Sequence, residues 1–244
     1  MEIAQHIGIF VCLALVIMVI CYCTSSETLE KFMDNEPTNK QTTYRHILLK
    51  TKEVLDELDI PFFLSSGTCL GYVRERDFME HDYDIDIGIH SEDYSPKLID
   101  AMSTKGLYLY RVLGTLKTGM ELSFYLPYTP TRQRAKIDIF IHQDKEGTAS
   151  QVPKTCWYSY NIERDRKLKY CVSQFKLKEI DFLGIKVNVP DPVKTYLEEH
   201  YGKDWRIPKS SGALGEYHYF SSPISLVNDL DQPDNDFWYE TNTF

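Results

Sequence analysis

Two stretches of the chain alternate polar and apolar residues with the period of two that predicts a β-strand. Residues 82–89 run Asp-Tyr-Asp-Ile-Asp-Ile-Gly-Ile, and residues 135–142 run Ala-Lys-Ile-Asp-Ile-Phe-Ile-His. Because successive side chains of a strand point to opposite faces of its sheet, the isoleucines of each stretch are expected on a buried face. The opposite face would then carry the acidic residues Asp82, Asp84, Asp86 and Asp138.

Helices are predicted where apolar residues recur at three- and four-residue spacing. The first such stretch is 44–58, and Thr38 and Gln41 before it have the spacing of a capping box. Further helices are expected after the small or capping residues at 65–68, 95–96 and 191–192. In the last of these, we expect Asp191 to cap the helix and Gly202 to end it.

Strands and surface segments account for the rest of the pattern. Further strands are predicted at 62–64, 107–113 and 120–126, and a hairpin is predicted at 182–190. The stretch 158–170 is dense in charged residues and is predicted to be an exposed insert. Together these elements predict an α/β (α+β) fold in which helices flank a mixed sheet.

The acidic face of the first alternating stretch predicts a metal site. Asp82, Asp84 and Asp86 would follow one another at about 7 Å along the strand. Two such charges repel by roughly 2–3 kcal/mol at an effective dielectric near 20. A divalent cation such as Mg²⁺ or Mn²⁺ would relieve this repulsion, because hard cations prefer carboxylate oxygens. The alternative is a solvent-exposed edge strand whose charges discourage aggregation.

Asp138 is the one acidic residue of the second alternating stretch. A lone aspartate in a hydrophobic strand costs free energy unless it is paired or coordinates a ligand. An ion pair with Lys136 or Arg134 would satisfy it. Since the chain already offers a pair of aspartates at Asp84 and Asp86, we expect Asp138 to supply a third ligand to the same metal site.

The sequence Ser-Ser-Gly-Thr at 65–68 connects an apolar strand to a predicted helix, fewer than twenty residues before the acidic stretch. Backbone N–H groups at such a turn can hold a phosphate. Ser66, Gly67 and Thr68 are therefore candidate nucleotide-binding residues. An ordinary turn followed by a helix cap is the alternative interpretation.

Length and charge limit the possible partners. The chain has 244 residues, which suits one domain with a substantial core and small additions. Its net charge of −9 argues against a nucleic-acid partner, which would favour a basic surface. In the globular part, the three cysteines allow at most one bridge, and Cys156–Cys171 is the plausible pair.

An uncharged apolar run extends from Ile7 to Cys23. As a helix it would be about 25 Å long, slightly short for an average bilayer. We expect a membrane anchor at 1–23, a linker at 24–39, a catalytic domain at 40–210 and an acidic, aromatic tail at 211–244. A cleaved signal peptide is the alternative for the first segment, although its apolar region is usually shorter.

Several of these stretches, taken in order, resemble the LicD family of nucleotidyltransferase-fold enzymes, and specifically its fukutin-like branch. The resemblance covers roughly residues 44–210. It rests on the residues 66–74 (SGTCLGYVR), 82–89 (DYDIDIGI), 136–140 (KIDIF) and 201–208 (YGKDWRIP). Each stretch alone is weak evidence, but the ordered set is specific.

The resemblance implies a mixed sheet that holds three metal-binding carboxylates. By position, Asp84 and Asp86 match the paired aspartates of the family, and Asp138 matches the third. Gly67 and Thr68 match a small-residue turn near the nucleotide phosphates, Ser66 begins the matching stretch, and Arg74 occupies a basic position. Asp82 is a possible further ligand, although Tyr83 interrupts the acidic run.

Members of this family transfer a phosphorylated alcohol, such as phosphocholine or ribitol phosphate, from a CDP-activated donor to a glycan hydroxyl. The resemblance therefore implies a metal-dependent transferase of this kind. With the apolar run, it also implies a single-pass type II membrane protein of the Golgi or endoplasmic reticulum, with a lumenal catalytic domain. A glycosyltransferase that uses a nucleotide-sugar and a non-catalytic glycan-binding or assembly protein are the two alternatives.

Overall fold

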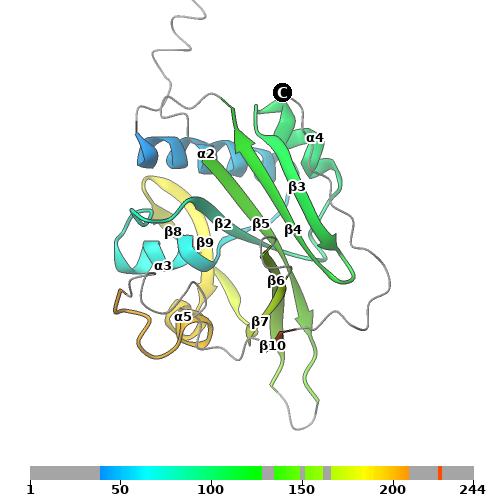
Figure 1. Ribbon diagram of the computed structural model, residues 1–244, viewed down its shortest axis with the longest axis vertical. Helices are drawn as coiled ribbons and strands as arrows, with labels where there is room; N and C mark the ends of the chain where they lie inside the picture. Colours follow the sequence, from blue (N-terminus) through cyan, green and yellow to red (C-terminus); the bar gives the residue numbers. More distant parts are fainter. Residues whose placement is uncertain (1–38, 128–134, 149–151, 162–165, 209–224, 227–244) are drawn as a thin grey trace, which may run out of the picture.

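The structure is a computed structural model that describes residues 39–127, 135–148, 152–161, 166–208 and 225–226 (Figure 1). Its centre is β5 (Ala135–Lys145), because the two halves of this strand pair with different neighbours. The first half pairs in parallel with β2 (Asp84–His90) and antiparallel with β4 (Gly119–Leu126). Residues 143–145 then pair with β6 (Lys154–Asn161), so that β5 joins both parts of the sheet.

The remaining strands extend this mixed sheet in two directions. Along the main path of the sheet the order is β10-β7-β6-β5-β2-β1-β9-β8, and β4 joins β3 to β5 off that path. The strands not yet given bounds are β1 (Phe63–Leu64), β3 (Tyr108–Thr115), β7 (Arg166–Ser173), β8 (Lys176–Phe182), β9 (Ile185–Asp191) and β10 (Ser225–Leu226). The observed mixed α/β sheet confirms the predicted fold class.

Two pairs of helices pack against this sheet (Figure 1). The first pair is α2 (Lys40–Glu57) and α4 (Lys97–Thr104), which contact each other, with α2 against β2 and β5 and α4 against β3. The second pair is α3 (Ser66–Arg74) and α5 (Val193–Tyr201), with α3 against β2 and α5 against β7 and β9. The helices predicted from apolar spacing and turn residues are all present.

The isoleucines of the two alternating stretches form the centre of the core, as predicted. All six have no exposed surface: Ile85, Ile87, Ile89, Ile137, Ile139 and Ile141. Burying each of them stabilises the fold by about 1.5–3 kcal/mol. Because their strands alternate, the aspartates of β2 and β5 must lie on the other face of the sheet.

The prediction that 158–170 is an exposed insert is wrong. This stretch contributes to β6 and β7, which pair antiparallel from Lys154 to Asn161. Tyr158, Leu168 and Tyr170 are buried there, and so is the charged residue Lys167. Cys156 and Cys171 face each other across this hairpin and form the predicted disulfide.

Two helix caps differ from the predictions. The side chain of Asn39 caps α2 by accepting a hydrogen bond from the Thr42 N–H at 2.9 Å, and Thr38 lies outside the described residues. The N-cap of α5 is Pro192, while Asp191 is the last residue of β9. A local capping pattern in the sequence therefore located each helix but did not define its exact first residue.

The predicted ends of the chain are only partly described. Among the described residues, no helix is both long and apolar enough to cross a membrane, and the run at 7–23 lies outside them. The acidic tail lies outside them as well, apart from β10, whose backbone adds an edge strand to β7.

Candidate active site

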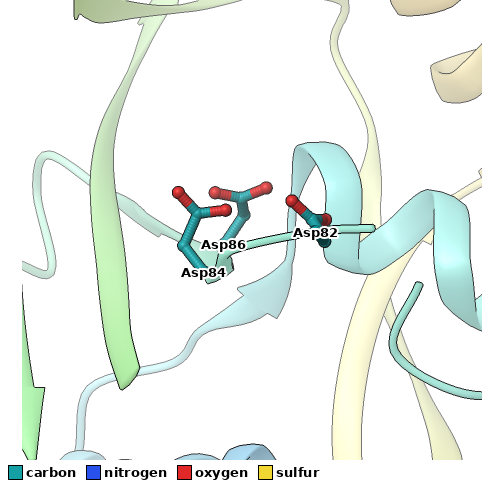
Figure 2. Close-up of side chains that lie close together, drawn as sticks. All are labelled: Asp82, Asp84 and Asp86. Atoms are coloured by element: carbon teal, nitrogen blue, oxygen red, sulfur yellow. The ribbon is translucent and has the colours of Figure 1, made fainter. Parts of the chain in front are cut away.

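Three aspartates from one short segment gather at the start of β2. Asp84 and Asp86 lie on the strand, while Asp82 lies in the loop before it, where the sequence predicted a strand residue. One carboxylate oxygen of each residue lies within 4.8 Å of the other two. Figure 2 shows the three side chains grouped beside the N-terminal turn of α3. The structure therefore adds Asp82 to the predicted Asp84–Asp86 pair.

The first turn of α3 binds Asp86 directly. The Gly67 N–H donates to Asp86 Oδ2 at 2.8 Å, and the Asp86 N–H donates to Thr68 Oγ1, also at 2.8 Å. A carboxylate at a helix N-terminus is stabilised by the free N–H groups and by the helix dipole. In this structure the Gly67 N–H, a predicted phosphate donor, is already bound to the aspartate.

Tyr196 of α5 holds the first turn of α3 in place through hydrogen bonds of its hydroxyl group. Its hydroxyl accepts a hydrogen bond from the Ser66 N–H at 3.1 Å and lies 3.0 Å from Ser65 Oγ. Ser66 has a φ of 39°, a left-handed conformation that non-glycine residues rarely adopt. The buried tyrosine thus stabilises an unusual backbone geometry that aims the start of α3 at Asp86.

Asp138 is paired with a lysine on the same face of the sheet. In the parallel pairing of β2 and β5, Asp86 lies opposite Asp138 and Asp84 lies opposite Lys136. Lys136 Nζ lies 2.7 Å from Asp84 Oδ2 and 2.6 Å from Asp138 Oδ2. The ion pair considered from the sequence is therefore present, and it brings Asp138 to the site beside Asp84.

Sequence reasoning missed an arginine and a glutamate on the neighbouring strands. Cross-strand pairing continues from Asp138 to Ser123 on β4 and from Ser123 to Arg111 on β3. Arg111 Nε donates to Ser123 Oγ at 3.1 Å, and its Nη2 lies 3.3 Å from Oε1 of the buried Glu121. In the sequence, Glu121 and Ser123 alternate with apolar neighbours, and this pattern could have indicated that they lie on the same face as the site.

Arg74 and Lys40 occupy different borders of this region. Arg74 is the last residue of α3, at the end opposite to Gly67, and forms a 3.5 Å ion pair with Glu75. Lys40 donates to the Met79 and Glu80 carbonyls, in the segment that leads to the aspartates.

Burial and mutual repulsion shift the protonation of the three aspartates in different directions. Burial, with Asp84 and Asp82 close by, raises the pKa of Asp86 well above its usual range. Burial and the neighbouring Asp84 raise the pKa of Asp82 to about 8. Burial also acts on Asp84, but the ammonium of Lys136 outweighs it and leaves the pKa of Asp84 lowered.

These residues fit a divalent cation. Three carboxylates supply hard oxygen ligands at one place. A doubly charged ion would offset the burial and the mutual repulsion that raise the pKa of Asp82 and Asp86. Asp82, Asp84 and Asp86 would hold such an ion. Asp138, Lys136 and Arg111 continue the polar face beside it, where an anionic substrate could contact the two cationic side chains.

The fold and this site define a mixed α/β protein with three carboxylates grouped beside a helix N-terminus. Residues 59–192 match the family described as "LicD/FKTN/FKRP, nucleotidyltransferase domain". The match covers more than half of the chain and includes β1, α3, β2 and β5, which build the site. The chain therefore belongs to the LicD family, as its motifs indicated.

Among curated proteins, the chain is similar to proteins named ribitol-5-phosphate transferase FKTN. The mouse protein is 34% identical over 170 residues, and the human protein is 32% identical over 170 residues. Each alignment covers 67% of this chain and 33% of the relative. The chain thus aligns with only a third of the length of these relatives.

The first prediction concerns Gly67, where a methyl group would lie 2.5 Å from Asp82 Oδ2 and 3.0 Å from Asp86 Oδ2. Alanine favours a helix over glycine by about 1 kcal/mol, so Gly67→Ala should keep the fold. It should displace the carboxylates and weaken Mn²⁺ binding about 10- to 100-fold, as measured by calorimetry. In an Asp82→Ala background the same change should cost less, and an equal cost in both backgrounds would contradict this contact.

The second prediction follows from the raised pKa of Asp82. The folded protein keeps a proton on Asp82 up to about pH 8, whereas an unfolded chain releases it at about pH 4. Because the folded state binds the extra proton in this window, the free energy of unfolding falls as the pH rises from about 4 to about 8. Asp82→Asn should flatten this decline in urea titrations with EDTA.

The exposed Asp100 of α4 offers a matched control for that experiment. Asp100→Asn should leave the decline with pH as it is in the unmodified protein. If Asp82→Asn also left it unchanged, the proton would have to reside on another group of the site.

Proposed function

We propose that this protein is a metal-dependent transferase that moves a phosphorylated alcohol of the ribitol phosphate type from a CDP-activated donor to a glycan hydroxyl. The single observation that carries the proposal is the convergence of Asp82, Asp84 and Asp86 beside the Asp138–Lys136 pair. Membership of the LicD family and similarity to proteins named ribitol-5-phosphate transferase support it. Because the alignment covers a third of those relatives, the donor and the acceptor are part of the proposal.

Each part of the site has a role in this reaction. A divalent cation held by Asp82, Asp84 and Asp86 would neutralise charge on the donor diphosphate and on the departing CMP. Arg111, which Glu121 and Ser123 hold in position, would contact a donor phosphate.

Asp138 would accept the proton of the attacking hydroxyl, and Lys136 beside it would hold that carboxylate in place. Alignment of the reactants and stabilisation of charge would supply most of the rate.

The disulfide supports a location in the secretory pathway. Cys156–Cys171 forms a bridge across β6 and β7, and such bridges persist in oxidising compartments. This agrees with the proposed type II topology, in which 7–23 anchors the chain and the catalytic domain faces the lumen of the Golgi or endoplasmic reticulum.

Two other functions make different predictions about ligands. A glycosyltransferase with an Asp-x-Asp centre would prefer UDP or GDP over CDP, since nucleotide-sugars carry those bases. A non-catalytic glycan-binding protein would bind glycan without a nucleotide. The Asp138–Ser123–Arg111 row next to the aspartates favours a ligand with phosphate groups, because it presents a fixed guanidinium beside a carboxylate centre.

The third prediction tests the cation and the nucleotide together. Without a cation, the three aspartates offer no positive charge to the diphosphate of CDP, so binding should be weak in EDTA and restored by Mg²⁺ or Mn²⁺. Each ligand should tighten the other by the same factor, because binding coupling is reciprocal. CDP and CMP should bind better than UDP or GDP. Calorimetric titrations of each ligand with and without the other measure both quantities.

Substitution of the site carboxylates completes this test. Asp84→Asn, Asp86→Asn and Asp138→Asn should each lower transfer about 100-fold or more while the protein still folds, and Asp100→Asn should not. Equal CDP affinity with and without cation would refute the metal-dependent centre. A clear preference for UDP would instead support the glycosyltransferase alternative.

The fourth prediction separates two candidate phosphate ligands. Arg111→Lys keeps a positive charge beside the buried Glu121 but loses the planar guanidinium, so it should weaken CDP binding about tenfold or more. Arg74 matches a basic position of the family, and Arg74→Lys tests it in the same assay. Arg45→Lys is the control, because Arg45 is exposed on α2 and its Nε donates to the Leu183 carbonyl. A larger loss for Arg74→Lys than for Arg111→Lys would assign the donor phosphate to the end of α3.

A further inference from the structure

Lys136 occupies the space between two carboxylates of the site. Its ammonium lies 2.7 Å from Asp84 Oδ2 and 2.6 Å from Asp138 Oδ2. The lysine side chain is only 25% exposed, and that of Asp138 is 5% exposed. Most lysines keep their charge in water, so this partly buried position calls for an explanation beyond a surface ion pair.

Strand pairing holds the ammonium in this position. Lys136 lies directly opposite Asp84 in the parallel pair of β2 and β5, and Asp138 is two residues further along β5 on the same face. The three side chains therefore come from adjacent positions of a rigid sheet. The contact does not depend on a loop, and it is present before any substrate binds.

The ammonium uses the oxygens that a bridging ion would need. A divalent ion between Asp84 and Asp138 would take carboxylate oxygens at about 2.0–2.1 Å, and it would have to displace Nζ from the oxygens it now contacts. By contrast, the ion pairs of Lys136 are with Asp84 and Asp138 and not with Asp82 or Asp86. The Asp82–Asp84–Asp86 group, with oxygens within 4.8 Å of one another, therefore keeps room for one ion.

We propose that this site takes one divalent cation per chain, at Asp82, Asp84 and Asp86, and that Lys136 supplies the second positive charge where a second ion would otherwise bind. The inference rests on the proposed function in that it assumes a cation at these carboxylates. It goes beyond it by assigning the number of ions and the role of the lysine. The second charge is then part of the chain and does not depend on the concentration of free metal.

The fifth prediction, and the test of this proposal, is the number of Mn²⁺ ions bound by the full chain. Calorimetry and Mn²⁺ electron paramagnetic resonance should give one magnetically isolated ion per chain in the unmodified protein. Lys136→Met removes the ammonium and should raise the number to two, with the broadened spectrum of two neighbouring ions. Lys136→Arg keeps a positive charge and should bind one.

Two further variants serve as controls. Lys136→Met combined with Asp138→Asn removes the carboxylate that the second ion would need, so it should again bind one ion. Lys154→Met removes a lysine that pairs with Glu199 at 3.4 Å outside the site and should leave the number at one. Thermal unfolding in EDTA checks that each variant is folded.

The possible outcomes separate this proposal from the proposed function. Two coupled ions in the unmodified protein would overturn the assignment of Lys136 and leave the metal-dependent reaction intact. One ion in both the unmodified protein and folded Lys136→Met would show that the lysine does not exclude a second ion. No bound ion would overturn both proposals. If Lys136→Met does not fold, the spectrum of the unmodified protein still decides between one ion and two.

Discussion

The parallel pairing of β2 with β5 is the interaction on which the rest of the structure depends. Six isoleucines bury one face of the two strands, and that burial fixes the register. The same register brings Asp84 to Lys136 and Asp86 to Asp138 on the opposite face. A slip by one residue would turn the isoleucines toward the polar face, so the hydrophobic core and the site are specified by one set of contacts.

Grouping several carboxylates costs free energy, and the surrounding structure offsets that cost at named positions. The Gly67 N–H binds Asp86, the ammonium of Lys136 binds Asp84 and Asp138, and Tyr196 holds the turn that presents Gly67. Burial and the neighbouring carboxylates nevertheless raise the pKa of both Asp82 and Asp86. This arrangement agrees with the proposed cation site.

The family match covers the part of the chain that builds the site. It begins at residue 59 and ends at 192, and so contains the strands that carry the aspartates, Lys136 and Arg111. Helices α2 and α5 lie outside it, although Tyr196 of α5 supports the start of α3. The membrane anchor and the tail stay predictions, because they fall mainly outside the described residues.

The sequence by itself determined the strands that carry the site, the face on which Asp84, Asp86 and Asp138 lie, the helices α2 to α5 and the Cys156–Cys171 pair. These features follow from local periodicity, turn residues and cysteine count. Only the tertiary structure decided that Asp82 joins from a loop, that Lys136 bridges two carboxylates, and that Arg111 and Glu121 complete the polar face. The physical reason is that periodicity tells which way a side chain points, whereas its neighbours depend on which distant strands pair and in what register.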